Sequence, residues 1–174
     1  MIDWPLVEFT YDQILLEVSA MCAPEHWTVK PQKLTTTKHK TKYGMADVDG
    51  VVYINQAFIG TTAIGLLDAT IRHELAHLCV GLHNGHNHLF KTKAKEFKAI
   101  FGRHLKAESE QVHAAIGYKY RLYATLEGSH KNVSEEILFR RVHRKHDKYV
   151  SYKPGRFRYL SIQGQKVLAF RYSE

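Results

Sequence analysis

The stretch from Ile71 to Lys91, IRHELAHLCVGLHNGHNHLFK, restricts the possible folds of this chain more than any other. It continues an apolar pattern with helical spacing. The apolar positions of that pattern are Ile64, Leu67, Ile71, Leu75 and Leu78. Thr61 or Thr62 is placed to cap such a helix, and Gly81 is placed to end it. The sequence therefore predicts an amphipathic helix over about 61–81.

Two histidines and a glutamate fall on one side of this predicted helix. His73 and His77 are four residues apart, which is about 400° of helical rotation, so their side chains lie one turn apart on one face. Neutral imidazoles are good zinc ligands, and a carboxylate beside them can take a proton from a zinc-bound water. The H-E-x-x-H spacing thus predicts a zinc hydrolase site with His73 and His77 as metal ligands and Glu74 as the general base.

The third ligand has to be His83, His86 or His88. The metzincin pattern places it ten residues after the first histidine, which selects His83. That pattern also needs a glycine seven residues after the first histidine, but Val80 stands there and the glycine follows at position 81. A histidine that is not a ligand can serve as a loop residue, orient a ligand or contact phosphate. The spacing alone leaves this choice open.

The segment HNHLFK, residues 86–91, resembles the third-ligand motif of the SprT-like, or Spartan-type, metalloproteases. Phe90 and Lys91 match that motif, whereas Asn87 stands where the family usually has Gly and His88 where it often has Pro. The resemblance covers roughly residues 10–103 and includes the order of an N-terminal helix, a Val-x-Ile-Asn strand and the H-E-x-x-H helix. It implies that His86 is the third ligand of one catalytic zinc ion. It also implies an endopeptidase that cleaves proteins bound or crosslinked to DNA.

The remaining patterns predict an α+β fold. We expect a small antiparallel sheet, the active-site helix with helices packed around it, and a basic, β-rich C-terminal unit. The boundary is expected after residue 104, giving a core of 1–104 and a C-terminal region of 105–174. Helices are expected at 10–23, 89–102 and 107–117, a strand at 26–34, a loop at 35–44, a hairpin around Asp49-Gly50, a strand at 118–128, helix or strand at 134–146, and a hairpin turning near Gly164.

Positive charge is concentrated near the C-terminus. The chain has a net charge of +8, yet residues 1–130 hold 14 Lys and Arg against 13 Asp and Glu, whereas residues 131–174 hold 11 against 4. This asymmetry predicts a polyanionic partner, and the resemblance implies single-stranded or junction-containing DNA. The candidate contacts are Arg144, Lys145, Lys148, Lys153, Arg156 and Arg158.

The C-terminal region has no cysteine, so it lacks the four-cysteine zinc ribbon that commonly follows the SprT-like core. Packing is expected to replace that zinc, through Tyr149, Tyr152, Phe157, Tyr159, Leu160 and Phe170. A second metal site built on His143 and His146 is a weaker alternative, and the oxyanion-stabilising group is left open among Tyr43, Tyr53 and the C-terminal basic residues.

The only two cysteines, Cys22 and Cys79, are far apart in sequence, and the N-terminus lacks a basic region before its apolar residues. With no run of about 18–20 apolar residues, an intracellular, non-secreted protein without membrane contact is expected. The rival hypothesis is a DNA-binding or regulatory module whose zinc site is structural or vestigial. Glu74 favours hydrolysis, because a structural site has no need of a carboxylate beside its first ligand.

Overall fold

The computed structural model describes residues 1–128 and 134–174 as an α+β fold. It divides into two compact units, Met1–Ile116 and Gly117–Glu174, and each is described by itself. The division falls later than the expected boundary after residue 104. Helix α4 (Lys106–Ile116) packs against α2 and η2 of the first unit, and its Val112 is buried in the core of that unit.

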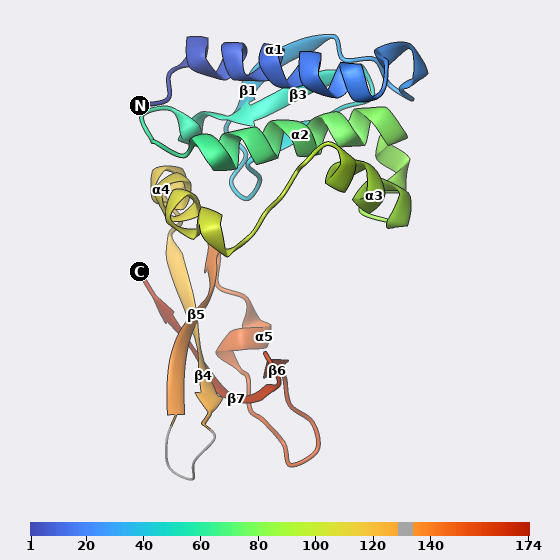
Figure 1. Ribbon diagram of the computed structural model, residues 1–174. Coiled ribbons are helices and arrows are strands. Elements are labelled where there is room, and N and C mark those ends of the chain that lie inside the picture. The colour runs from blue at the N-terminus through green and yellow to red at the C-terminus, as the bar shows by residue number, and fades with distance from the viewer. Residues whose placement is uncertain (129–133) are drawn as a thin grey trace. The chain divides into compact units, whose positions relative to one another are not determined.

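The first unit holds four helices and a small sheet (Figure 1). Its elements are α1 (Trp4–Met21), η1 (Pro24–His26), β1 (Lys33–Thr37), β2 (Gly44–Ala46), β3 (Val51–Asn55), η2 (Gln56–Phe58), α2 (Ile64–Val80), η3 (Leu82–Asn84), α3 (His88–Glu96), η4 (Arg103–Leu105) and α4. The strand order is β1-β3-β2, with β1 parallel and β2 antiparallel to β3. The sheet is therefore mixed, whereas an antiparallel one was expected.

Local patterns placed most of these elements correctly, with four differences at their ends. Helix α3, expected over 89–102, ends at Glu96, and Lys98 follows with a left-handed φ of +61°. Helix α1 begins at Trp4 because Asp3 caps it, accepting the Leu6 N–H at 2.9 Å. The strand expected at 26–34 begins only at Lys33, and it continues through the threonines that were assigned to a loop. These β-branched residues suit the parallel ladder with β3. The hairpin at Asp49-Gly50 is confirmed, with Gly50 at φ +80°.

Helix α2 is the centre of the first unit, with α1, α3, α4, β2 and β3 around it. Leu67, Ile71, Leu75 and Leu78 of the predicted stripe are fully buried, but Ile64 is exposed. Neither Thr61 nor Thr62 caps the helix. Instead, Glu108 of α4 accepts the Leu66 N–H at 2.6 Å, which puts a carboxylate at the positive end of the helix dipole. Gly81 ends the helix at φ +92°, as predicted.

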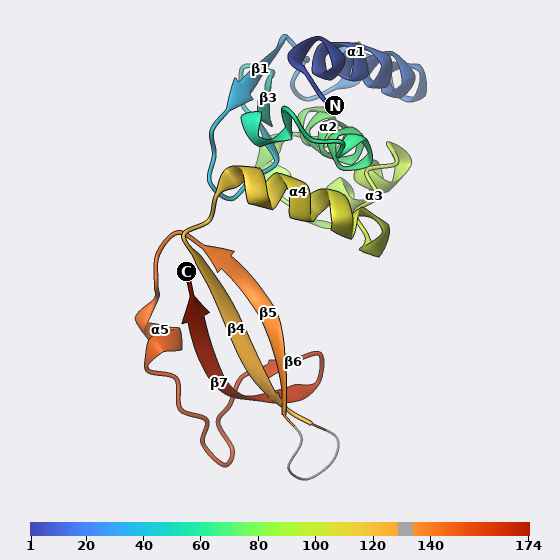
Figure 2. The same cartoon turned by 90° about the vertical axis from the view of Figure 1, so that its left-hand side faces the viewer.

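The second unit is an antiparallel sheet of order β5-β4-β7-β6 with one short helix, and Figure 2 shows β5, β4 and β7 side by side. Its elements are β4 (Tyr120–Glu127), β5 (Ser134–Val142), α5 (Asp147–Val150), β6 (Ser161–Ile162) and β7 (Gln165–Ser173). The ambiguous segment 134–146 is therefore largely strand, and the hairpin near Gly164 is confirmed. Among the described residues, no helix is long and apolar enough to span a membrane.

The core of this unit differs in part from the expected aromatic packing. Ala124, Leu126 and Val167 form it, and Tyr152, Leu160 and Phe170 pack against it. Tyr149 joins them through the Phe170 ring, with centroids 4.8 Å apart. Phe157 and Tyr159 were expected there too, but they are 88% and 49% exposed. Both lie in the loop between α5 and β6, in or next to the turn closed by the Gly155 N–H and the Arg158 carbonyl, whereas Tyr152 and Leu160 are bonded to each other at the base of the loop.

Candidate metal centre

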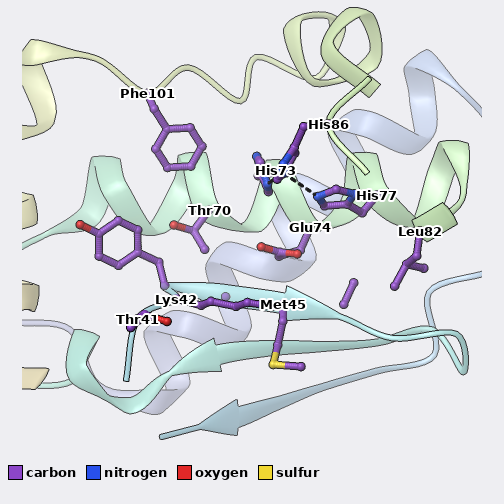
Figure 3. A pocket seen from close by; sticks show the side chains of 13 residues that line it. Thr41, Lys42, Met45, Thr70, His73, Glu74, His77, Leu82, His86 and Phe101 are labelled. Atoms are coloured by element: carbon purple, nitrogen blue, oxygen red, sulfur yellow. Dashed lines mark hydrogen bonds between the residues drawn. The ribbon is translucent and has the colours of Figure 1, made fainter. Parts of the chain in front are cut away.

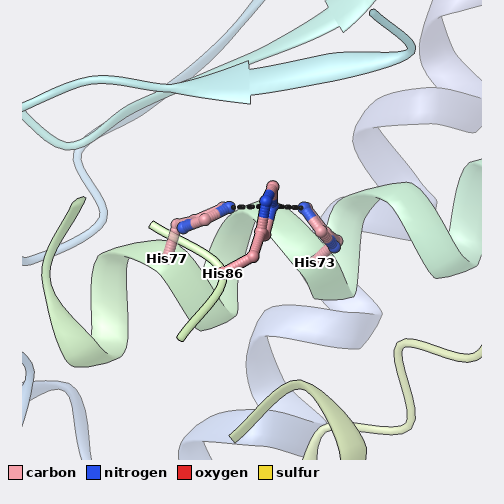
Figure 4. Close-up of side chains that lie close together, drawn as sticks. All are labelled: His73, His77 and His86. Atoms are coloured by element: carbon pink, nitrogen blue, oxygen red, sulfur yellow. Dashed lines mark hydrogen bonds between the residues drawn. The ribbon is translucent and has the colours of Figure 1, made fainter. Parts of the chain in front are cut away.

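Three imidazole rings from two segments meet at one point (Figure 4). His73 and His77 lie on α2, and His86 lies in the loop between η3 and α3. The Nε2 atom of His86 is 3.1 Å from Nε2 of His73 and 3.2 Å from Nε2 of His77. The three ligand atoms lie within 4.8 Å of one another, and no other such group of His, Cys or acidic residues occurs in the described parts of the chain.

A metal ion fits between these nitrogen atoms. With metal–nitrogen distances of about 2.0–2.1 Å and tetrahedral angles, two ligand nitrogens lie about 3.3 Å apart. The observed separations of 3.1 and 3.2 Å are close to that value. Facing imidazole lone pairs also repel one another, and one Nε2 proton cannot serve two neighbours well. The group of His73, His77 and His86 can therefore hold a metal ion.

Phe90 of α3 holds the three rings in place. Its side chain is 3% exposed and stacks on His77, with ring centroids 4.1 Å apart. It also meets His73 and His86 edge-on, each at 4.8 Å. The aromatic position of the third-ligand motif is thus a packing residue beneath the histidine group.

Hydrogen bonds within the loop position His86. Asn87 caps α3, because its Oδ1 accepts the Phe90 N–H at 3.1 Å. Its Nδ2 donates to Asn84 Oδ1 at 2.9 Å, and Asn84 Nδ2 donates in turn to the Val80 carbonyl at 2.6 Å. These bonds join the end of α2 to the start of α3 on either side of His86. Asn87 therefore has a structural role at this position.

Burial keeps His73 and His77 neutral and makes the Glu74 carboxylate a stronger base. It lowers the pKa of both His73 and His77 to about 4, assisted by the charges of neighbouring histidines. Neutral imidazole is the form that binds a metal. Burial also raises the pKa of Glu74 to about 7, opposed by the charge of Lys42 and by the Ala46 N–H that bonds the carboxylate. A carboxyl group with such a pKa is suited to exchange a proton near neutral pH.

The histidine group and Glu74 line a cavity of about 560 Å³ between α2 and β2 (Figure 3). Strand β2 passes very close to the helix. A Cβ atom on Gly44 would lie 2.8 Å from Thr70 Cγ2 and 3.2 Å from Glu74 Cγ, so glycine permits this approach. The other lining residues are Thr41, Lys42, Tyr43, Met45, Ala46, Leu82 and Phe101.

The two tyrosines considered for oxyanion stabilisation are engaged elsewhere. The Tyr43 hydroxyl lies 2.7 Å from Ser109 Oγ and 2.8 Å from His113 Nε2, both on α4. The Tyr53 hydroxyl donates to Asp47 at 2.8 Å. Among the described residues that line the cavity, Lys42 is the one lysine or arginine. Sequence reasoning placed it only in a basic loop, and no local pattern connects it to the H-E-x-x-H helix.

The other two candidate ligands lie outside the histidine group. His83 sits beside the end of α2, where its ring approaches the Cα hydrogens of Gly81 and its Nε2 lies 3.1 Å from Asn84 Nδ2. His88 is the exposed first residue of α3. One unexpected neighbour pair also occurs in this unit: the thiols of Cys22 and Cys79 are 3.8 Å apart despite 57 residues of separation.

All six candidate DNA contacts are exposed on the second unit. Lys145 lies beside Tyr120 at one end of β4, with Nζ 4.9 Å from the ring centroid. Lys148 is in α5, and Lys153, Arg156 and Arg158 follow in the loop before β6. All six lie within residues 144–158, one segment of the chain.

Comparison with protein-family models, with curated proteins and with solved structures gives no match for this chain.

Proposed function

We propose that this protein is a zinc-dependent endopeptidase of the SprT-like type that cleaves proteins associated with DNA. The observation that carries the proposal is the meeting of three imidazole Nε2 atoms with the buried carboxyl group of Glu74 in one cavity. Three imidazole ligands suit zinc, and a structural zinc site is normally closed by a fourth protein ligand. In the described parts of the chain the group has three members.

Each residue of the site has a separate role in peptide hydrolysis. His73, His77 and His86 would hold the ion, which when bound polarises a carbonyl group and lowers the pKa of water. Glu74 accepts the proton of the attacking water and delivers it to the leaving amine. Lys42 lines the same cavity and supplies positive charge for the oxygen that becomes negative as the carbonyl is attacked. The ring of Phe90 keeps the ligand side chains from turning.

Strand β2 offers a place for an extended substrate. It is an edge strand, and the Asn55 N–H of β3 donates to the Tyr43 carbonyl. Because bonding alternates along an antiparallel pair, Gly44 and Ala46 direct their main-chain groups away from β3, and the Ala46 N–H among them bonds Glu74. A peptide in extended conformation can add to such an edge by main-chain hydrogen bonds. Proteins with unfolded or extended segments are therefore the expected substrates.

The DNA part of the proposal comes from the second unit, where exposed basic residues accompany aromatic ones. Lysine and arginine neutralise phosphates, and this contribution falls with salt. The alternative function is a DNA-binding or regulatory module with a structural zinc site. The buried Glu74 beside the histidine group favours the enzyme.

The test is a cleavage assay with zinc, a histone substrate, and single-stranded, double-stranded or no DNA. Wild type is compared with Glu74→Gln and with Glu25→Gln, an exposed glutamate as the matched control. Zinc content is measured on each protein. Fragments from wild type and Glu25→Gln, but none from Glu74→Gln at equal zinc content, are expected. Stoichiometric zinc and DNA binding with no cleavage under any condition would favour the binding module, and cleavage independent of DNA would remove only the DNA part.

A further inference from the structure

Residues 143–160, which we name the basic segment, run from the end of β5 through α5 to the start of β6 (Figure 1). The segment contains six Lys and Arg and one acidic residue, Asp147, for a formal charge of +5. All six basic side chains are exposed. Its charge therefore suits a polyanion.

The aromatic residues of the basic segment face two ways. Tyr149 and Tyr152 turn inward onto Phe170, with ring centroids 4.8 and 5.0 Å away. Phe157 and Tyr159 turn outward and are 88% and 49% exposed. The inward pair supplies the packing of this unit, so the outward pair is available to a ligand.

Hydrogen bonds hold the loop that carries the outward pair, both at its tip and at its base. The Gly155 N–H donates to the Arg158 carbonyl at 2.8 Å, which closes a turn with Phe157 at its tip. At the base, the Tyr152 hydroxyl accepts the Leu160 N–H at 2.9 Å and donates to the Val167 carbonyl at 3.1 Å. A ring presented by such a loop loses less conformational freedom on binding.

Cations accompany both exposed rings. The Arg156 guanidinium lies 5.2 Å from the Phe157 centroid, and Lys166 Nζ lies 5.2 Å from the Tyr159 centroid. Each exposed ring thus has over it a cation that can bind phosphate. This pairing of a stacking surface with a positive charge matches the chemistry of a nucleotide.

We propose that Phe157 and Tyr159 stack on unpaired bases of a single-stranded nucleic acid whose phosphates are neutralised by the basic segment. This inference rests on the nucleic-acid part of the proposed function and names the residues that select its form. In a duplex both faces of each base are already stacked, so the two rings gain a partner only from a strand with unpaired bases.

The length of β4 sets the expected size of the site. Lys145 lies beside Tyr120 at one end of β4, and Val167, the neighbour of Lys166, pairs with Leu126 near the other. Six residues of strand span about 20 Å. One phosphate per about 3.4 Å of stacked strand then gives a site of about six nucleotides.

A membrane surface is the other polyanion that basic and aromatic residues can bind. Arg156 and Arg158 flank Phe157, so the outward pair offers an apolar layer two rings that Arg158 separates. Stable interfacial binding needs a larger apolar face than this. The structure therefore favours the nucleic acid.

The experiment uses the zinc-loaded full chain with Glu74→Gln, so that no cleavage occurs, and measures fluorescence anisotropy of labelled single strands and duplexes. Phe157→Ala is expected to weaken single-strand binding roughly 5- to 150-fold, the loss of one stacked base, and to leave duplex binding nearly unchanged. Phe157→Trp should keep the affinity, and Phe157→Leu, which is apolar but has no aromatic face, should lose it. Phe9→Ala is the matched control, because Phe9 is a 61% exposed phenylalanine on α1.

Each outcome of these binding measurements either supports or overturns the stacking proposal. Equal losses for single strands and duplexes, or full affinity with Phe157→Leu, would overturn stacking and leave only electrostatic binding. Binding to vesicles with an anionic headgroup that depends on Phe157 and survives Phe157→Leu would show the membrane instead. Cleavage of an unfolded protein without DNA is measured separately on chains that retain Glu74, so failure of this inference and failure of the proposed peptidase are distinguishable.

Discussion

Replacing Asn87 by alanine tests whether local hydrogen bonds set the position of His86. The substitution removes the acceptor of the Phe90 N–H at the start of α3 and the donor to Asn84. Loss of a helix cap costs about 1 kcal/mol, within a range of about 0.5–2 kcal/mol. The bond to Asn84 is exposed and should add little.

This cost can appear in two measurements. If the loop is ordered without metal, the melting temperature in chelator should fall by about 3–5 °C for a cooperative unit of 116 residues. If the loop orders only when zinc binds, about 1 kcal/mol appears as a roughly fivefold weaker zinc affinity, measured by competition with a chromophoric chelator.

Two further substitutions at the same position separate the cap from the side-chain contact. Asn87→Asp keeps the cap acceptor and should match wild type. Asn87→Gly should lose only a few tenths of a kcal/mol, because glycine is a tolerated cap. If Asn87→Ala equals wild type in both assays, or if Asn87→Gly is less stable than Asn87→Ala, contacts other than the Asn87 cap hold the loop.

Three further changes probe the site and the core. His86→Ala should weaken zinc binding by more than about 100-fold, since losing even a residue that only orients a ligand costs about 10- to 100-fold in affinity. His83→Ala should bind zinc about as tightly as wild type. If a zinc titration shows the larger loss for His83→Ala, His83 is the third ligand. Gly44→Ala should cost about 1–3 kcal/mol in a denaturant melt, because the new methyl group would lie 2.8 Å from a side-chain carbon of α2; an unchanged midpoint would show that β2 can move. Hydrogen bonds from Arg72 and, to a smaller extent, from Lys98 lower the pKa of Glu17 to about 2. This carboxylate therefore stabilises the fold above its unfolded pKa near 4.5, and the contribution is lost as pH falls toward 2. The destabilisation by Glu17→Gln, about 1 kcal/mol for a partly exposed group, should be largest near neutral pH and vanish in acid; a difference that does not change with pH would exclude this linkage.

Local patterns in the sequence were enough to predict most of the helices and strands. The stripe of Leu67, Ile71, Leu75 and Leu78 is a property of consecutive helical turns, and the Asp49-Gly50 hairpin is a property of its turn. The start of α2 was different, because the Leu66 N–H in its first turn donates to Glu108, 42 residues away. The parallel pairing of β1 with β3 is likewise a contact between distant segments, and threonines that suit such a ladder also suit a loop.

The site residues also divide into those placed by local spacing and those placed by contacts between distant segments. His73, Glu74 and His77 are placed by one helical turn, so their spacing alone brings them together. Spacing left His86 undecided, and the loop bonds of Asn87 explain why this histidine reaches the other two. Lys42 reaches the cavity only because strand β2 passes close to α2, and no periodicity in the sequence records that approach.

Phe157 shows that residue type alone does not predict which aromatic side chains are buried. The sequence offered six large apolar or aromatic side chains to replace the zinc of a ribbon, and all six suited a core equally well. In the structure Tyr152 takes the central place, because its hydroxyl ties two backbone segments together while its ring packs on Phe170. Phe157 lies in the turn that the Gly155 N–H closes with the Arg158 carbonyl, and its ring is exposed. Because both bonds at the base of the loop use the Tyr152 hydroxyl, Tyr152→Phe should loosen the loop and weaken single-strand binding in the anisotropy assay, although Tyr152 itself packs inward on Phe170; unchanged affinity would show that these bonds do not position Phe157.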